Sequence, residues 1–211
     1  MKGRLIIISS PSGGGKGTLI REVLDMVPNI GYSISATTRA PRPGEDDGTH
    51  YCFVSRSEFD ERIARDEFLE YAEVHGNLYG TTRSQTEKMT GEGLDVVLEI
   101  DVQGAKEICK KVPDAVSIFI LPPSFDVLKL RLTGRATEGD EDLDLRLRNS
   151  FDEVMHYSEF DYVIVNDDVA TASRNLAAVI LAERQTLNRQ SEVIQGILGS
   201  FARANLSKPE N

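Results

Sequence analysis

The stretch Ser9-Ser10-Pro11-Ser12-Gly13-Gly14-Gly15-Lys16-Gly17-Thr18 decides the fold of this chain. It follows an apolar run at residues 5–8, which is typical of a buried parallel strand, and it precedes a helical pattern at residues 18–26. Glycines let successive backbone N–H groups turn toward one point, and the start of a helix adds about half a positive charge there. A strand, a glycine-rich turn, a lysine and a helix in this order predict a loop that binds phosphate groups.

The residue types of this loop fit the phosphates and the metal of a nucleoside triphosphate. Lys16 brings a full positive charge to the outer phosphate oxygens, and the hydroxyl of Thr18 lies near enough to the helix start to reach Mg²⁺. The usual pattern has glycine where this chain has Ser10, and it has the hydroxyl directly after the lysine, where Gly17 stands. The alternative is a glycine-rich connection that carries a surface lysine. The predicted donor-binding residues are Ser12, Gly13, Gly14, Gly15, Lys16, Gly17 and Thr18.

Composition excludes several classes of protein. The 211 residues carry 24 Lys and Arg against 34 Asp and Glu, a net charge of −10, which argues against nonspecific coating of nucleic acid. Cys52 and Cys109 lack metal-type spacing and indicate a reducing compartment. No apolar stretch approaches the roughly 18 residues of a membrane span. We therefore expect a cytoplasmic chain with no membrane and no nucleic-acid partner, in an oligomeric state that the sequence leaves open.

Buried runs alternate with helical patterns along most of the chain, which predicts an α/β fold with a parallel sheet flanked by helices. Further buried strands are expected at residues 95–100, 116–121 and 162–165. Helices are expected at residues 103–111, 125–132 and 143–154, with a long final helix at 170–187.

The stretch at residues 33–89 has a different pattern, with alternating strands, turns and short helices. We expect strands at 32–38, 51–54 and 68–74, and a helix at 58–65 that Ser57 caps. This stretch is interpreted as an inserted mixed α+β lobe. The core is then expected to comprise residues 1–32, 90–124 and 151–211, and residues 125–150 form a separate helical segment.

Further motifs follow the phosphate loop in order. They are Thr37-Thr38-Arg39-Ala40-Pro41-Arg42-Pro43-Gly44-Glu45, Gly48-Thr49-His50-Tyr51, Phe68-Leu69-Glu70, Gly76-Asn77-Leu78-Tyr79-Gly80-Thr81, Glu99-Ile100-Asp101-Val102-Gln103-Gly104, Phe119-Ile120-Leu121-Pro122-Pro123 and Val165-Asn166-Asp167-Asp168. With these motifs, nearly the whole chain resembles the bacterial-type guanylate kinases, which belong to the P-loop nucleoside monophosphate kinases. The resemblance implies a P-loop NTPase-type sheet, a GMP-binding lobe at 33–89 and a lid at 125–150. It also implies the reaction ATP + GMP → ADP + GDP with Mg²⁺, in purine nucleotide metabolism.

Two arginines lie on a proline-stiffened loop at residues 39–44, which cannot be a helix interior. Guanidinium groups bind phosphate oxygens through paired N–H donors, and phenol hydroxyls add neutral donors. The resemblance implies that Arg39, Arg42, Tyr51 and Tyr79 hold the phosphate of GMP. The alternative is a solvated basic loop.

Guanine recognition is the second role that the resemblance assigns. Guanine offers N1–H and an exocyclic amine as donors and O6 as an acceptor, which a carboxylate and a hydroxyl complement. Adenine would leave groups of such a site unpaired, at a cost of about 1–3 kcal/mol for each buried group. The implied residues are Ser35, Glu70, Thr81 and Asp101; taken alone, Glu70 is read as an ordinary surface acid.

Glu99 and Asp101 lie at the end of a predicted buried strand, where open α/β sheets face their ligands. Acids at this position can orient Mg²⁺-bound water or contact the acceptor nucleotide, and solvated strand-end acids are the alternative. The family commonly has aspartate where this chain has Glu99.

Arginines of the predicted lid are the last group of candidates. Arg131 and Arg135 are four residues apart and share one helix face. The resemblance places them, with Arg146, around the transferred phosphoryl group, as catalytic residues beside Lys16. It also gives Asn166 a contact on the adenine side. The spacing alone favours ordinary surface charges.

Two other functions fit parts of the sequence. One is a kinase of another nucleoside monophosphate or of a small phosphorylated sugar on the same fold. The other is a catalytically silent scaffold that binds phosphopeptides. Such scaffolds usually lack a working phosphate loop, whereas Lys16 and its glycines are present in this chain.

Overall fold

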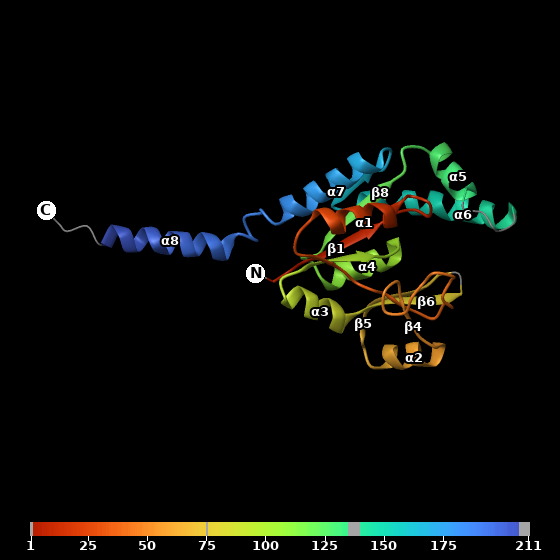
Figure 1. Ribbon diagram of the computed structural model, residues 1–211, viewed down its shortest axis with the longest axis horizontal. Helices are drawn as coiled ribbons and strands as arrows, with labels where there is room; N and C mark the ends of the chain where they lie inside the picture. The colour runs from red at the N-terminus through yellow and green to blue at the C-terminus, as the bar shows by residue number, and fades with distance from the viewer. Residues whose placement is uncertain (1, 75, 135–139, 207–211) are drawn as a thin grey trace.

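The computed structural model describes residues 2–74, 76–134 and 140–206. Its centre is a five-stranded parallel sheet with the strand order β2-β7-β1-β8-β9 (Figure 1). The strands are β1 (Leu5–Ser9), β2 (Ile30–Tyr32), β7 (Asp95–Glu99), β8 (Val116–Leu121) and β9 (Tyr162–Val165). β1 lies between β7 and β8, with Ile8 opposite Glu99 on one side and Ile118 on the other. The predicted α/β fold with a parallel sheet is confirmed.

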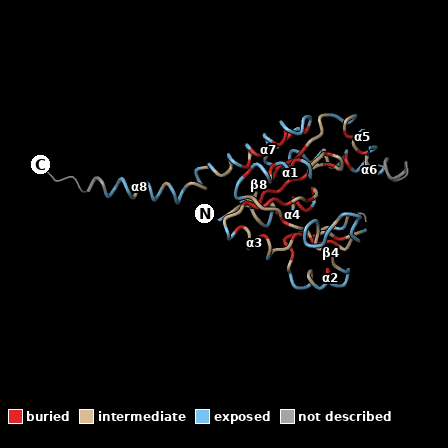
Figure 2. The backbone as a smooth tube through the Cα atoms, in the orientation of Figure 1, coloured by how far each residue is buried: buried red, intermediate tan, exposed pale blue. Residues whose placement is uncertain are grey.

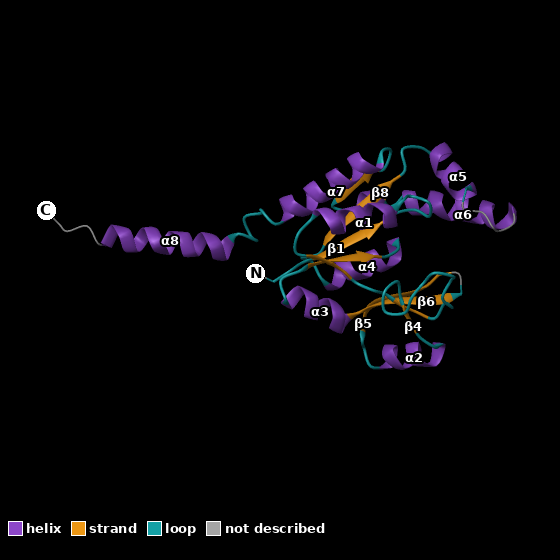
Figure 3. Cartoon of the chain, in the orientation of Figure 1, coloured by secondary structure: helices purple, strands orange, loops and turns teal. Residues whose placement is uncertain are grey.

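Helices cover both faces of this sheet (Figures 1 and 3). Helices α1 (Lys16–Met26) and α7 (Val169–Glu183) pack on one face, where Ile8, Leu19 and Leu176 are fully buried. Helix α4 (Val102–Lys111) covers the other face through Ala105 and Ile108. The strands are apolar because both faces are covered, and their carboxyl ends all open on one edge.

A second sheet of four strands has the order β4-β3-β6-β5. Its strands are β3 (Ala36–Thr37), β4 (Cys52–Phe53), β5 (Phe68–Val74) and β6 (Asn77–Thr82). Helix α2 (Arg56–Ala64) packs under it, and the rings of Phe59 and Phe68 stack with their centres 4.4 Å apart. Helix α3 (Arg83–Gly91) leads from β6 back to the first sheet.

The chain passes from the first sheet to the second within a few residues. β2 ends at Tyr32 and β3 begins at Ala36. The single strand predicted at 32–38 is therefore wrong, because those residues divide between two sheets. Sequence reasoning also omitted β6, which pairs antiparallel with β5, and placed the cap of α2 at Ser57 whereas Ser55 accepts the hydrogen bond from the Glu58 N–H.

The remaining helices are α5 (Phe125–Thr133), α6 (Asp140–Val154), the short 3-10 helix η1 (Tyr157–Glu159) and α8 (Ser191–Leu206). The prediction of one final helix at 170–187 is wrong, since α7 ends at Glu183 and α8 follows. Helix α8 extends away from the two sheets, and its described side chains are largely exposed (Figures 1 and 2). None of the described helices combines the length and apolar composition that crossing a bilayer requires.

Candidate active site

The phosphate loop connects β1 to α1 at the carboxyl edge of the first sheet. Gly13 and Gly15 have φ angles of 80° and 86°, a conformation that side-chain-bearing residues rarely adopt. Gly15 is the residue before α1, and no side chain caps that helix end. The first N–H groups of α1 are therefore available to an anion at the point that the sequence predicted.

Two residues from distant parts of the chain hold this loop. The Asn166 side-chain amide donates to the Gly14 carbonyl at 2.9 Å, and the Arg131 guanidinium donates to the Asn166 carbonyl at 2.9 Å. A Cβ on Gly15 would lie 2.3 Å from Asn166 Nδ2, so the loop and this side chain fit against each other. One guanidinium nitrogen of Arg131 and Asn166 Oδ1 are buried without a hydrogen-bond partner, which leaves polar capacity beside the loop.

Lys16 joins the phosphate loop to the ends of the central strands. Its ammonium donates to the Ile100 carbonyl at 3.0 Å and lies 4.0 Å from Glu99 Oε1. The hydroxyl of Tyr32 donates to Glu99 Oε2 at 3.1 Å. Burial, and then the Glu99 carboxylate, raise the pKa of Tyr32 well above its usual value, so the phenol stays protonated.

A cavity of about 220 Å³ lies between the two sheets, next to Lys16. The structure brings together in its wall five of the eight residues predicted to bind GMP, along with Glu99. The lining residues that the sequence had singled out are Lys16, Ser35, Tyr51, Glu70, Tyr79, Glu99 and Asp101.

Glu70 is the buried acid of this cavity, with only 5% of its surface exposed. Its Oε1 accepts hydrogen bonds from the Thr81 hydroxyl at 2.6 Å and from the Thr81 N–H at 3.1 Å. The pKa of Glu70 is raised to about 7, mainly by burial; the hydrogen bond from the Thr81 hydroxyl opposes this rise and the charge of Asp101 adds to it. Asp101 caps α4 by accepting from the Gly104 N–H at 2.8 Å. The surface-acid interpretation of Glu70 is therefore wrong.

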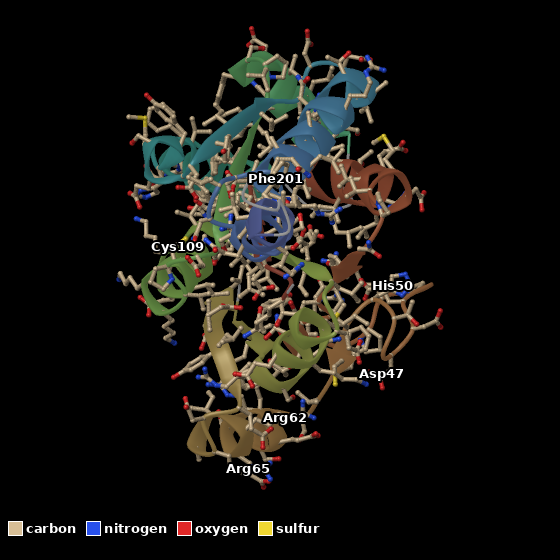
Figure 4. All side chains as sticks on the ribbon, turned by 90° about the vertical axis from the view of Figure 1, so that its left-hand side faces the viewer. Asp47, His50, Arg62, Arg65, Cys109 and Phe201 are labelled. Atoms are coloured by element: carbon tan, nitrogen blue, oxygen red, sulfur yellow. The ribbon has the colours of Figure 1, made fainter. Side chains whose placement is uncertain are left out.

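The basic loop supplies the other wall. The Arg39 guanidinium lies 2.9 Å from Glu45 Oε1 and 5.2 Å from the ring centre of Tyr51, whose ring contacts that of Tyr79. The hydrogen bond from Arg39, followed by one from the Arg42 backbone, lowers the pKa of Glu45 to about 2. Glu45 thus orients Arg39 and ties both arginines into one turn. The Arg42 residue is exposed, and the same loop carries Asp47 and His50 on its outer side (Figure 4).

A second cavity of about 400 Å³ lies between α6 and α4. Arg146, Ser12 and Asp101 line it. Thr18 is exposed on the first turn of α1, and Arg135 lies outside the described residues. Helix α6 also contacts the phosphate loop directly, because the Ser12 N–H donates to Glu153 Oε2 at 2.9 Å and the Ser150 hydroxyl donates to the Ser12 carbonyl at 3.3 Å.

Sequence reasoning missed Tyr32, Ser150 and Glu153 as neighbours of these groups. Tyr32 is the last residue of a short strand, so the end-of-strand rule that selected Glu99 could have selected it too. Nothing in the local pattern around Glu153 points to Ser12, which is 141 positions away.

Comparison with known proteins identifies the family. The guanylate kinase family model matches residues 2–183. The chain is 48% identical to a guanylate kinase of Clostridium perfringens, over 90% of this chain and 88% of the relative. It is 49% identical to a guanylate kinase of Escherichia coli, over 90% and 93% respectively. A crystal structure of guanylate kinase from Anaplasma phagocytophilum superposes with a TM-score of 0.76 at 35% identity, covering 89% of each chain. This chain therefore belongs to the guanylate kinase family.

Proposed function

We propose that this chain transfers the γ-phosphoryl group of ATP to GMP, giving ADP and GDP, with Mg²⁺ as cofactor. The observation that carries this proposal is the cavity that Lys16 and Glu70 share. One end of it meets the phosphate loop, and the other holds a buried carboxylate with a hydroxyl beside it. A phosphoryl donor and a guanine-bearing acceptor therefore fit on one continuous path.

The donor site uses the backbone N–H groups of residues 13–18, the ammonium of Lys16 and the spare N–H capacity of Arg131. Phosphoryl transfer passes through a loose transition state in which negative charge spreads over the equatorial oxygens. Fixed donors that need no rearrangement stabilise such charge strongly. The hydrogen bond from Asn166 to Gly14 supports this role, because it fixes the loop before the nucleotide binds.

The acceptor site complements guanine and its phosphate separately. Glu70, when ionised, accepts from N1–H and the exocyclic amine, and hydroxyls of Ser35 and Thr81 provide the polar edge. Arg39 and Arg42, with the phenols of Tyr51 and Tyr79, are the donors for the phosphate dianion. AMP would place the hydrogen-bond acceptor N1 of adenine against the Glu70 carboxylate, which is also an acceptor. We therefore expect the site to prefer GMP over AMP.

The residues present fit Mg²⁺ bound largely by the nucleotide. Among residues 2–74, 76–134 and 140–206, no group of three or more His, Cys, Asp or Glu side chains forms a metal site. Mg²⁺ commonly takes one or two protein oxygens together with phosphates and waters. The Thr18 hydroxyl and, through water, the carboxylates of Glu99 and Asp101 are the oxygens on offer. Bound Mg²⁺ would neutralise charge on the β- and γ-phosphate oxygens.

The donor and the acceptor are assigned to different sheets. We assign donor binding to the core at residues 1–32, 90–124 and 151–211, and acceptor binding to the lobe at 33–89. Residues 125–150 would act as the lid that brings Arg131, Arg135 and Arg146 to the phosphoryl group and excludes water. Since the Ser150 hydroxyl, at the end of this lid, donates to the Ser12 carbonyl at 3.3 Å, motion of the lid would reach the phosphate loop directly.

Initial rates with ATP, Mg²⁺ and a panel of monophosphate acceptors test this function. We expect GMP to be phosphorylated far faster than AMP, CMP or UMP, and Lys16→Ala to abolish the reaction while Lys88→Ala, an exposed lysine on α3, retains it. Turnover of AMP equal to that of GMP would contradict the role of Glu70. A folded chain that phosphorylates no acceptor would contradict the proposed reaction and favour a binding scaffold.

A further inference from the structure

Tyr32 and Glu99 meet at the carboxyl edge of the first sheet, on the face that α1 covers. β2 pairs with β7 so that Tyr32 lies opposite Val97. Side chains two positions apart along a strand share a face, so Glu99 projects on the same side as Val97 and just beyond it. The Tyr32 ring packs against the core under α1, and its hydroxyl extends to Glu99 Oε2 at 3.1 Å.

The two oxygens of Glu99 have different neighbours. Oε2 accepts the Tyr32 hydrogen bond, whereas Oε1 lies 4.0 Å from the Lys16 ammonium. Both oxygens lie near the start of α1, at 3.7 Å for Oε1 and 3.9 Å for Oε2 from where a Cβ on Gly17 would be. Tyr32 and Glu99 also line a cavity of about 290 Å³ with Gly17, on the α1 side of the strand end. One oxygen is thus held by Tyr32, and the other faces the Lys16 ammonium.

A glutamate at this position needs such a restraint more than an aspartate does. Its extra methylene adds a rotatable bond, and its side chain keeps 31% of its surface exposed. A phenol anchored in the core restricts that freedom, since the ring position is fixed by packing rather than by solvent-exposed contacts. An aspartate carboxylate ends one bond closer to its own strand, so we expect it to lose the 3.1 Å contact with the Tyr32 hydroxyl.

We propose that Tyr32 is a positioning residue for the reaction: its hydroxyl fixes Glu99 so that Oε1 remains beside Lys16 and Gly17 at the start of α1. Tyr32 touches neither nucleotide in this role and acts through Glu99 alone. The inference rests on the proposed function, since it assigns Glu99 to the donor side of the site. It predicts that the Tyr32 hydroxyl raises kcat only when residue 99 is glutamate.

A double-mutant cycle tests this dependence. Tyr32→Phe is expected to lower kcat about threefold to tenfold with little change in the KM for GMP. The reason is that the Glu99 carboxylate, which is proposed to act in the transition state, loses the hydrogen bond from the tyrosine hydroxyl. In the Glu99→Asp background, the same tyrosine change is expected to alter kcat by less than about twofold. An equal loss in both backgrounds, or no loss in either, would overturn the positioning role.

A matched control separates positioning from stability. Tyr162 donates to Glu183 in a second tyrosine–glutamate pair that joins β9 to α7 outside the site. Tyr162→Phe removes a hydrogen bond of the same type and is expected to lower the melting temperature while kcat stays at the wild-type value. If both variants lost kcat in proportion to their melting temperature, Tyr32 would be a structural residue only.

Calorimetric binding of a non-hydrolysable ATP analogue gives a readout that does not depend on turnover. Tyr32→Phe is expected to reduce the gain in affinity that Mg²⁺ provides by about threefold and to leave affinity without Mg²⁺ unchanged. An unchanged gain would contradict the proposal. If wild-type chain failed to phosphorylate GMP, the proposed function would fail; active wild-type chain with no coupling in the cycle would remove only the role of Tyr32.

Discussion

The side-chain amide of Asn166 donates a 2.9 Å hydrogen bond to the carbonyl oxygen of Gly14, across 152 positions of sequence. This bond connects the end of β9 to the turn between β1 and α1. Because Asn166 is buried and its carbonyl accepts a hydrogen bond from Arg131, the position of Gly14 is held from outside the loop. The proposed donor site therefore depends on residues that the loop motif does not contain.

We expect Gly15→Ala to reduce affinity for an ATP analogue more than tenfold. Its φ of 86° strains any side-chain-bearing residue by about 1–2 kcal/mol, and the new Cβ would lie 2.3 Å from Asn166 Nδ2. Calorimetry measures the affinity. Gly76→Ala is the matched control, since its φ is 75° with open space around the Cβ position. Equal losses in the two variants would show that backbone strain alone, and not the fit to Asn166, is responsible.

Glu70 makes the free energy of unfolding depend on pH in a direction unusual for an acid. Its pKa is about 7 in the folded chain against 4.5 for the ordinary group, so the folded state binds more protons between these values. Stability should therefore fall as the pH rises through this window, by an amount on the order of 3 kcal/mol. Urea unfolding at pH 5 and pH 8 measures the change. Glu70→Gln should show a smaller decline, and an identical decline in both proteins would contradict the raised pKa.

Affinity for GMP should change with pH in the opposite direction. Guanine needs the ionised carboxylate, so binding should strengthen about tenfold per pH unit below pH 7 and level off above it. Calorimetric titrations between pH 5.5 and pH 8.5 follow this change. Glu70→Gln binds GMP weakly, and its remaining pH dependence reports the phosphate alone. A wild-type profile no steeper than that of the variant would rule out recognition by the Glu70 carboxylate.

Arg42 tests the phosphate-binding loop, since its backbone N–H anchors the turn to Glu45 while its side chain is exposed. Arg42→Ala should raise the KM for GMP about tenfold to a hundredfold and change kcat less than about threefold, because a charged donor to the substrate is lost. Arg56→Ala is the control, an exposed arginine that pairs with Asp60 on α2. A change in the affinity for ATP alone would count against the assignment of Arg42.

Much of the fold and of the site follows from local pattern. The buried runs predicted the parallel sheet because both of its faces are covered, and the glycine-rich turn between a strand and a helix lies where the motif at residues 12–18 predicted it. The second sheet was harder to predict from the sequence, since β3 and β4 each have only two residues and the strands they pair with are distant along the chain. Burial of Glu70 was also hidden, because the residues that cover it come from α4 and β6.

The last helix shows the other limit. α8 carries Ile197, Leu198 and Phe201 with half or more of their surface exposed. No other described helix or strand packs along it (Figure 1). Helices are predicted from sequence most readily when their apolar face packs on a core. The apolar residues of α8 do not pack on the first sheet, so that signal is missing.

Ending the chain after Ser191 is therefore expected to leave kcat unchanged and to shift the melting temperature by less than about 2 °C. This end point retains Arg189, which pairs with Asp95. Calorimetry and initial rates measure the two quantities. A large loss of either would mean that α8 supports the enzyme through contacts made in solution, and light scattering would then report whether a second copy supplies them.

Gly104, at the start of α4, fits closely against the acceptor pocket. A Cβ on this residue would lie 2.8 Å from Glu70 Oε2 and 3.2 Å from Asp101 Oδ1. The Glu70 carboxylate, to which we assign selection of the purine, belongs to the second sheet, and the start of α4 that confines it packs on the first. Base selectivity would then depend on the spacing between the sheets, and substitutions at residues 33–34 in the connection are expected to alter which nucleotide is accepted without changing any group assigned to the base.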